Sequence, residues 1–410
     1  MNDSSKSAAE LPLENVKVID GATLGAGPFA ATFLGDFGAD VIKLEYPNGG
    51  DDIRRFGPEN AVWKWASRNK RSVAVDLHEE EGKEILKALI EDADVFINNF
   101  RTGRLEQWGI GWETLSEVNP NLVMVRTTGF GRTGPYKEMP GFGTLAEAMS
   151  GFASVTGPAD GPPTLPATML GDSVSSLFST FAAMIGLYWR DVEGGTGQLI
   201  DTSILEPMFM TMADHALRYS VADIVHERHG NRQPGNPGRN TYKTKDGRWV
   251  GLSPGGDAVI ERVLRIVGGE EAVNDPRFES QEARQENIDE LEALIQDWMS
   301  EHTREEVREV FEEYEAAVAP VYNMEDIFED QHFRERDAII EVEDDEFGAI
   351  EMPGVFPKLS KTPGEVRHTG PTAVGQHTAE VLAEEMSLTE DEIAELEQRG
   401  IIRTDDTTQQ

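Results

Sequence analysis

One carboxylate, Asp172, lies where a loop of small residues ends and a long uncharged stretch begins. From Val174 to Trp189 there is no charge, and apolar side chains recur at three- and four-residue spacing. This pattern predicts a helix that is apolar on most faces and buried. We expect Asp172 just before this helix, at or near its N-cap, where amide donors and the helix dipole keep a carboxylate ionised. Such a carboxylate can act as a nucleophile toward an activated acyl group.

The alternative is that Asp172 only caps its helix. The Gly-Asp pair has little specificity by itself, because it also occurs at Gly35-Asp36, Gly50-Asp51 and Gly256-Asp257. The role of Asp172 therefore depends on the residues that the fold brings around it.

Two clusters of basic residues are candidates for binding phosphates. The run Arg68-Asn69-Lys70-Arg71-Ser72 precedes a predicted strand at 73–76, and Arg and Lys are common phosphate ligands. The second cluster, Arg101 and Arg104, follows a predicted strand at 95–97, and loops at the carboxyl ends of strands hold ligands in open α/β sheets. The alternatives are a solvated turn for the first cluster and pairing with surface acids for the second.

The first β-α-β unit contains a glycine-rich turn, between a predicted strand at 16–20 and a predicted helix at 29–37. Gly25–Ala30 fits the dinucleotide pattern G-x-G-x-x-A, and Glu45 ends the next strand. However, four residues separate Asp20 from Gly25, whereas in a dinucleotide turn the first glycine follows its strand almost directly. The spacing therefore disfavours a dehydrogenase, although the turn still offers amides at a helix start to an anionic or amide-rich ligand.

Strands and helices alternate up to about residue 205, which predicts an α/β fold with a doubly wound, mostly parallel, Rossmann-like sheet. A long helix at about 206–221 leads out of it. We place this large domain at 1–225. The remaining predicted elements of the domain are strands at 40–45, 122–127 and 199–201 and a helix at 79–93.

A Gly/Pro-rich loop at 226–240 begins a smaller α+β domain, which we place at 226–325, followed by a C-terminal segment at 326–410. The loop is expected to be mobile and to act as a lid. Its arginines could receive a second carboxylate of a substrate, or they could pair with surface acids in a linker; they are Arg228, Arg232 and Arg239. The C-terminal segment is predicted to contain a hairpin at 339–352 and helices at 378–385 and 389–398.

The chain is strongly acidic, with 75 Asp and Glu against 37 Lys and Arg, a formal charge of -38 and a pI near 4.5. This charge argues against binding to nucleic acids or anionic membranes, both of which need basic patches. The acids are spread along the chain, so we infer adaptation to high salt, where screening shortens to about 3 Å at 1 M. An acidic binding protein would instead concentrate its charge on one face.

The residue types present exclude several kinds of chemistry. There is no cysteine, which excludes disulfides, thiolate catalysis and cysteine-based metal sites. The eight histidines show no metal-ligand spacing, so we predict no metal centre. No apolar signal core precedes residue 10, and we read no run as long enough for a membrane helix. A soluble cytoplasmic protein is therefore predicted.

Taken together, these segments resemble the family III CoA-transferases, the group of formyl-CoA transferase and carnitine CoA-transferase, which is related to the α-methylacyl-CoA racemases. The resemblance runs from about residue 16 to residue 400. Its most specific matches are Ala26-Gly27-Pro28, Asn69-Lys70-Arg71-Ser72, Asn99-Phe100-Arg101 and Gly171-Asp172. The resemblance implies a CoA-binding large domain, a C-terminal segment that returns to it, and an interlocked homodimer.

The resemblance also implies a mechanism in which Asp172 is the nucleophile. Its carboxylate attacks an acyl-CoA thioester to give a mixed anhydride, the released CoA thiolate then forms an aspartyl-CoA thioester, and an acceptor carboxylate completes the exchange. The acyl-CoA and the carboxylic acid are substrates, and no cofactor is permanently bound. The implied binding residues are Thr23, Leu24, Gly25 and Ala26 for the pantetheine arm, Lys70, Arg71 and Arg101 for the CoA phosphates, and Asn99 and Phe100 beside them.

Two departures from the family narrow the prediction. Racemases carry a His-Asp pair where this chain has Phe142-Gly143, and without the histidine a two-base proton transfer lacks a partner for Asp172. Formyl-CoA transferase has a glutamine where this chain has Gly25, which leaves room for a bulkier acyl group. We therefore predict transfer of CoA from succinyl-CoA to a C4 or C5 dicarboxylate such as mesaconate. An α-methylacyl-CoA racemase and a non-catalytic CoA-binding subunit are the alternatives.

Overall fold

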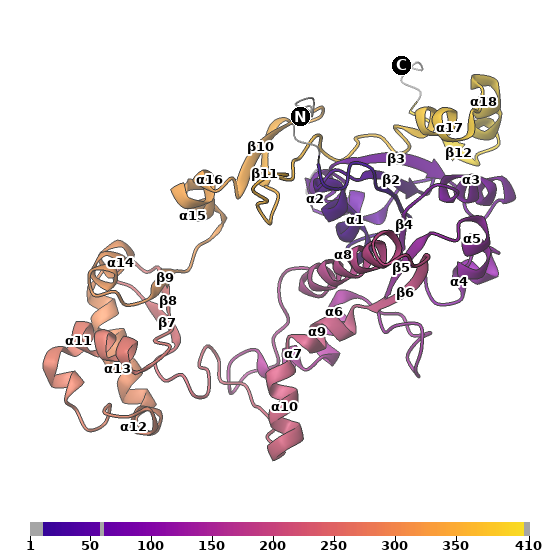
Figure 1. Ribbon diagram of the computed structural model, residues 1–410. Helices are drawn as coiled ribbons and strands as arrows, with labels where there is room; N and C mark the ends of the chain where they lie inside the picture. Colours follow the sequence, from indigo (N-terminus) through magenta and orange to yellow (C-terminus); the bar gives the residue numbers. More distant parts are fainter. Residues whose placement is uncertain (1–10, 58–60, 406–410) are drawn as a thin grey trace, which may run out of the picture. The chain divides into compact units, whose positions relative to one another are not determined.

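The computed structural model describes residues 11–57 and 61–405, and the chain divides into two compact units (Figure 1). The sequence prediction placed residues 153–164 in the large domain at 1–225, whereas the structure assigns them to the smaller unit. The larger unit consists of Met1–Phe152, Leu165–Ile224 and His332–Gln410, and the smaller one of Ala153–Thr164 and Val225–Gln331.

A seven-stranded sheet forms the centre of the larger unit, in the order β12-β3-β2-β1-β4-β5-β6. All neighbouring strands are parallel except β12, which runs antiparallel to β3. The mostly parallel α/β sheet predicted from the alternation of elements is therefore present, and its order reverses between β1 and β4. The strands are β1 Lys17–Asp20, β2 Asp40–Glu45, β3 Lys70–Val75, β4 Val95–Asn98, β5 Val123–Thr128, β6 Gln198–Ser203 and β12 Ile402–Arg403.

Helices cover both faces of this sheet. On one face, α1 (Ala26–Asp36) and α8 (Leu170–Asp191) pack against alternate strand residues such as Val18 and Val123. On the other face, the apolar stripe of α3 (Glu80–Ile90) packs with α5 (Trp112–Val118) on the intervening residues such as Phe96. The two-residue period of the strands thus gives two separate cores.

The surface of α8 that faces the sheet is lined by small residues, which corrects the prediction of a helix buried on most faces. Gly186 approaches β5 so closely that a Cβ there would lie 2.7 Å from a methyl group of Val123. The large apolar side chains that carry the helical periodicity lie on the other side and are 40–63% exposed; they are Leu177, Phe178, Phe181, Ile185 and Tyr188. Their spacing predicted the helix, but small residues decide which side is covered.

By length and composition alone, α8 is long and apolar enough to cross a membrane. This finding corrects our statement that no run in the sequence reaches that length. The core helix of a soluble protein passes the same test, and α8 lies against α1, β5 and β6 in the core of the larger unit.

Two shorter helices replace the single helix predicted at 206–221. The structure contains α9 (Leu205–Met210) and α10 (Ala213–Ala222). Between them, the amides of Thr211 and Met212 bond to carbonyls three residues back, which tightens the turn and interrupts the α-helical pattern.

The C-terminal part of the chain adds to the larger unit. It forms the predicted hairpin, β10 (Ile339–Asp344) and β11 (Gly348–Pro353), and two helices, α17 (Thr378–Met386) and α18 (Glu390–Gln398). Fully buried side chains of α17, Val381 and Leu382, join the core under α3. β12 then completes the edge of the sheet beside β3.

The smaller unit contains a three-stranded antiparallel sheet, β7 (Asn240–Lys243), β8 (Trp249–Leu252) and β9 (Val318–Pro320). One face of this sheet packs on helices around a separate apolar core that includes Tyr242 and Phe311. The helices are α11 Asp257–Val273, α12 Gln281–Glu286, α13 Ile288–Glu301 and α14 Arg304–Glu313.

Candidate active site

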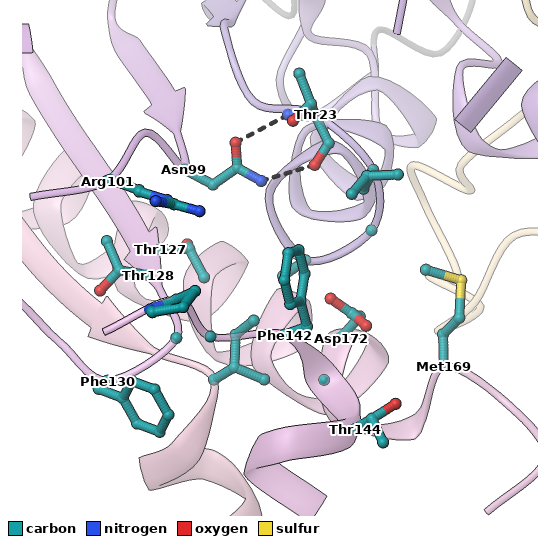
Figure 2. Close-up of a pocket in the computed structure, with 18 of the residues that line it drawn as sticks. Thr23, Asn99, Arg101, Thr127, Thr128, Phe130, Phe142, Thr144, Met169 and Asp172 are labelled. Atoms are coloured by element: carbon teal, nitrogen blue, oxygen red, sulfur yellow. Dashed lines mark hydrogen bonds between the residues drawn. The ribbon is translucent and has the colours of Figure 1, made fainter. Parts of the chain in front are cut away.

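A cavity of about 350 Å³ opens in the larger unit beyond the carboxyl ends of β1, β4 and β5 (Figure 2). This is where the strand order reverses, the usual ligand position in an open α/β sheet. The loops after the three strands contribute residues 23–26, then Asn99, Arg101 and Thr102, and then residues 129–130; Asp172 lines the cavity from α8. We call it the Asp172 cavity.

Asp172 reaches the cavity from within the first turn of α8; it lies near the N-cap, as predicted, but inside the helix and not before it. The N-cap is Met169, which makes no side-chain cap, and the helix already includes Leu170. The first turn closes when Ser173 N–H bonds to the Met169 carbonyl at 2.9 Å. The carboxylate of Asp172 therefore projects sideways from the helix into the cavity.

Burial raises the pKa of Asp172 above its ordinary value, and the negative charge of Glu147 raises this pKa further. A hydrogen bond from the Ala26 backbone N–H acts in the opposite direction and favours the ionised form. The net rise in the pKa of Asp172 is opposite in direction to the effect that we expected from the helix terminus. A more basic carboxylate is a better nucleophile once ionised, as the Brønsted relation for thiolates illustrates.

Glycines leave the carboxylate of Asp172 in contact with bare backbone. A Cβ on Gly25 would lie 2.9 Å from the Asp172 Cβ and 2.6 Å from the Met169 Cε. A Cβ on Gly143 would overlap Asp172 Oδ2. Both positions therefore require glycine if the carboxylate is to keep this orientation.

Gly143→Ala should lower kcat about 100-fold, because the added methyl group must displace the Asp172 carboxylate and an error of about 1 Å in a reacting group has this effect. The measurement is the steady-state rate of the CoA transfer that the family resemblance implies. Gly251→Ala in β8 is the matched control, since a Cβ there would meet only a carbonyl oxygen at 3.8 Å. Unchanged kcat in Gly143→Ala would contradict the geometry described here.

The predicted pantetheine loop, Thr23–Ala26, lines the cavity and is fixed by neighbouring side chains. Thr23 N–H donates to Asn99 Oδ1 at 2.9 Å, and Asn99 Nδ2 donates to the Thr23 carbonyl at 2.7 Å (Figure 2). Leu24, whose φ is 66°, donates its N–H to Asp51 Oδ1 at 3.0 Å. The structure thus brings Asn99 and the whole predicted loop together beside Asp172.

Two predicted phosphate ligands lie elsewhere. Lys70 is fully buried, and its Nζ bonds to Asp20 Oδ2 at 2.9 Å and to the Pro28 carbonyl at 2.7 Å. Arg71 pairs with Asp40 at 2.7 Å and with Glu384 at 2.7 Å. Neither residue lines the cavity, because β3 begins at Lys70 and carries this part of the basic cluster into the sheet instead of a turn.

Of Phe100 and the second basic cluster, Arg101 and Arg104, only Arg101 lines the cavity. Phe100 does not line the cavity; its ring packs edge-on against Trp108, with centroids 5.3 Å apart, at the margin of the core. Arg101 is exposed and lines the cavity, and within the described residues its guanidinium forms no ion pair. Arg101 is therefore the member of this cluster that is available to a ligand.

A buried network of charges, which the sequence analysis missed, supports the pantetheine loop. Lys43 lies between Asp51, 2.9 Å away, and Asp20, 3.9 Å away, and Lys70 pairs with the other oxygen of Asp20. All four side chains are at most 1% exposed. Lys43 also donates to the Ala22 carbonyl, so this acid–lysine network fixes the turn that leads to the cavity.

Two further charged residues in the cavity were also missed. Lys137 lines it and forms no ion pair among the residues that the structure describes. Glu147, in α6 (Gly143–Met149), lines it as well, is only 2% exposed, and accepts Gly171 N–H at 2.9 Å. A signal for Glu147 was present, because it is the only charged residue between Met139 and Ala159 in an otherwise apolar and small-residue segment.

The three arginines of the Gly/Pro-rich loop have different partners inside the smaller unit. Arg228 donates to the backbone carbonyls of Ser154 and Gly161 at 3.2 and 3.0 Å. Arg232 pairs with surface acids of α13, at 2.6 and 2.7 Å. Arg239 donates to a backbone carbonyl and forms no ion pair within 11–57 and 61–405. Of the three, only Arg232 has a carboxylate partner among the described residues.

A carboxylate at the switch point of a doubly wound sheet, beside backbone donors and unpaired cations, is the arrangement expected of an α/β enzyme that transfers acyl groups. The family model that matches residues 13–378 is described as CoA-transferase family III, and the chain belongs to this family of enzymes. Its members act on acyl-CoA thioesters as substrates.

Similar proteins span nearly the whole chain. Succinyl-CoA--D-citramalate CoA-transferase of Chloroflexus aurantiacus is 38% identical over 95% of this chain and 98% of its own. The succinyl-CoA--L-malate CoA-transferase beta subunit of the same organism is 38% identical over 96% and 98%. The crystal structure of a CAIB/BAIF family protein from Brucella suis is 30% identical and covers 92% of this chain and all of that one, with a TM-score of 0.83.

Proposed function

We propose that this protein transfers CoA from succinyl-CoA to a C4 or C5 dicarboxylate, with Asp172 as the covalent acyl carrier. The observation that carries the proposal is the half-buried Asp172 carboxylate in the cavity, which bonds to the Ala26 amide and has no basic side chain paired with it in the described structure. The names of the two Chloroflexus relatives support the donor and the acceptor class.

The proposed reaction balances without a cofactor. Asp172 attacks the thioester carbonyl carbon, the C–S bond breaks, and CoA leaves as a thiolate. A mixed anhydride between Asp172 and the succinyl group remains. The thiolate then attacks the Asp172 carbonyl carbon, which releases succinate and leaves an aspartyl-CoA thioester. The acceptor carboxylate repeats these two steps in reverse, so that its own thioester is released and the Asp172 carboxylate is restored.

The cavity supports this reaction over racemisation. No histidine lines it in the described structure, and bare backbone of Gly143 occupies the place beside Asp172 where a racemase carries its acid–base pair. When the thiolate attacks the Asp172 carbonyl carbon, the Asp172 oxygen gains negative charge, and the Ala26 N–H that bonds to this carboxylate is placed to stabilise it.

Arg101 is proposed to bind a phosphate of CoA or a substrate carboxylate, and Arg101→Gln should raise the KM for succinyl-CoA about tenfold with little change in kcat. The loss of one charge-assisted hydrogen bond, about 1.5–3 kcal/mol, accounts for this change. Arg104→Gln is the control, because the Arg104 guanidinium lies 5.7 Å from the Trp108 ring and outside the cavity lining. Equal KM values for the two variants would exclude this role.

The acceptor is proposed to be a small dicarboxylate, and mesaconate is our specific candidate. The protein would be incubated with succinyl-CoA and, separately, mesaconate, malate, citramalate, glutarate and acetate, and new thioesters would be detected by mass. Buffers of low and molar salt are both needed, because the charge of -38 predicts adaptation to high salt. A new thioester with a dicarboxylate supports the proposal, whereas transfer to acetate alone, or to no acid, contradicts it.

We also propose that the protein is a homodimer. The large apolar side chains exposed on one side of α8 form a continuous patch, and such patches mark interaction surfaces, whereas single exposed apolar residues are normal on a monomer. Light scattering should give twice the 45.3 kDa mass of the chain. Phe181, 63% exposed on that side, is the test position: Phe181→Asp should give a monomer, and Phe181→Leu should stay dimeric. A monomeric wild-type protein would contradict this proposal.

A further inference from the structure

The first turn of α8 carries the nucleophile, yet no side chain of its own caps that turn. The free amides at a helix start need acceptors. The amide of Gly171, directly before Asp172, donates to Glu147 Oε1 at 2.9 Å. The cap therefore comes from another helix, α6.

A second contact joins α6 to the same turn. Gly143 and Glu147 are four residues apart in α6 and so lie on one side of it. Gly143 lies against both the Asp172 carboxylate and the backbone of Gly171. A Cβ added to Gly171 would be 2.9 Å from the Gly143 carbonyl oxygen. One side of α6 thus contacts the nucleophile-bearing turn through backbone at one end and through a carboxylate at the other.

The position of α6 is itself fixed by apolar packing. Ala146, between the two contact residues, is 1% exposed and packs with Ala26 of α1 and Met208 of α9. The contact from α6 to Asp172 is therefore supported by two other helices of the larger unit, α1 and α9. A side chain held in this way can define the position of a neighbouring group.

Glu147 is also chemically unusual for a buried acid. Glu147 is only 2% exposed, and no Lys or Arg in the described parts of the chain forms an ion pair with its carboxylate. A buried charge without a counterion lowers stability. The amide of Gly171 offsets part of this cost, and the charge also acts on Asp172 nearby.

We propose that Glu147 is a positioning residue for CoA transfer: it caps the first turn of α8 in trans and so holds the Asp172 carboxylate in line with the bound thioester. This inference rests on the proposed function, because it assigns Glu147 a role in the attack by Asp172. The residue does not itself contact the reacting atoms.

Two variants separate the hydrogen bond from the charge. Glu147→Gln keeps an oxygen acceptor for Gly171 N–H, and Glu147→Leu removes it at similar volume. The rate of aspartyl-CoA formation is measured in a single turnover with succinyl-CoA, by mass of the intact protein, and normalised to the folded fraction from circular dichroism. Glu117→Gln, an exposed acid of α5, is the control for charge and is expected to match wild type.

We expect Glu147→Leu to form the adduct about 100-fold more slowly at an unchanged KM for succinyl-CoA, as displacement of a reacting group predicts. Glu147→Gln should keep most of the rate. The acidic limb of its profile of rate against pH should move to lower pH, because the variant lacks the negative charge that raises the pKa of Asp172. The other charged groups lining the cavity, Arg101 and Lys137, are unchanged in both variants.

The outcomes separate this inference from the proposed function. If the wild-type protein forms no adduct on Asp172, the proposed function fails. If wild type forms it and Glu147→Leu forms it at the same rate, or if that variant changes only KM, the positioning role is wrong. A pH profile of Glu147→Gln that coincides with wild type would exclude the electrostatic contribution.

Discussion

Asp172→Asn should lower kcat/KM for CoA transfer by about four orders of magnitude or more, the scale of losing a covalent nucleophile. Asparagine has nearly the same shape, but its neutral amide cannot attack a thioester to form an anhydride. The structure predicts little effect on folding, because the side chain makes no ion pair in the described residues and already has a raised pKa. Product thioesters would be measured by mass.

Two further measurements make this prediction specific. Asp191→Asn, the same change at the opposite end of α8, should leave transfer near the wild-type rate, since Asp191 pairs with Arg190 on the surface. Hydroxylamine added during turnover should convert residue 172 to a hydroxamate in wild type only. Transfer by Asp172→Asn, or a trapped adduct at another residue, would contradict the assignment of the nucleophile.

Lys43→Met should destabilise the protein by about 3–5 kcal/mol, the typical effect of removing one partner from a buried ion pair. In the acid–lysine network, two lysines balance two aspartates out of contact with water. Methionine fills a similar volume but leaves Asp51 without its counterion. Because Asp51 also accepts the Leu24 N–H, the pantetheine loop should loosen and the KM for the CoA ester should rise.

Denaturant unfolding measures this effect. The control is Lys87→Met, which removes a surface pair with Glu84 in α3 and should change stability by about 0.5 kcal/mol or less. If the two variants lost equal stability, the network would have no special structural role. Restoring stability in Lys43→Met by adding Asp51→Asn would show that the unpaired carboxylate causes the loss.

Hydrophobic periodicity was sufficient to predict the six parallel strands of the sheet, but not its edge strand β12. Strands that read as continuous apolar runs proved to be the buried parallel strands β1, β4 and β5. The loops that follow them meet at one edge of the sheet, where Thr23 bonds to Asn99; the assignment of these two residues to CoA came from the family resemblance. Local chemistry added Asp172, whose wider context only the family resemblance supplied.

The roles of the basic residues could not be predicted in the same way. A lysine in a cluster of cations has the same local sequence whether it lies in a turn or begins a strand. Lys70 became a core residue because Asp20, fifty positions earlier, is its partner on β1, which β2 separates from β3 in the sheet. Nor does periodicity distinguish the two sides of α8, since close approach of Gly186 to the sheet is a tertiary property.

The sheet is closed at one edge by a strand made long after its partner. β12 pairs with β3, and the helices before it bring Val381 and Leu382 under the same edge. During synthesis, one edge of β3 therefore has unpaired amides and carbonyls, and the apolar surface beneath it is exposed, until the C-terminal segment has been made. An edge of this kind can pair with another nascent chain. Productive folding of this enzyme therefore depends on protection of that edge until β12 has been synthesised.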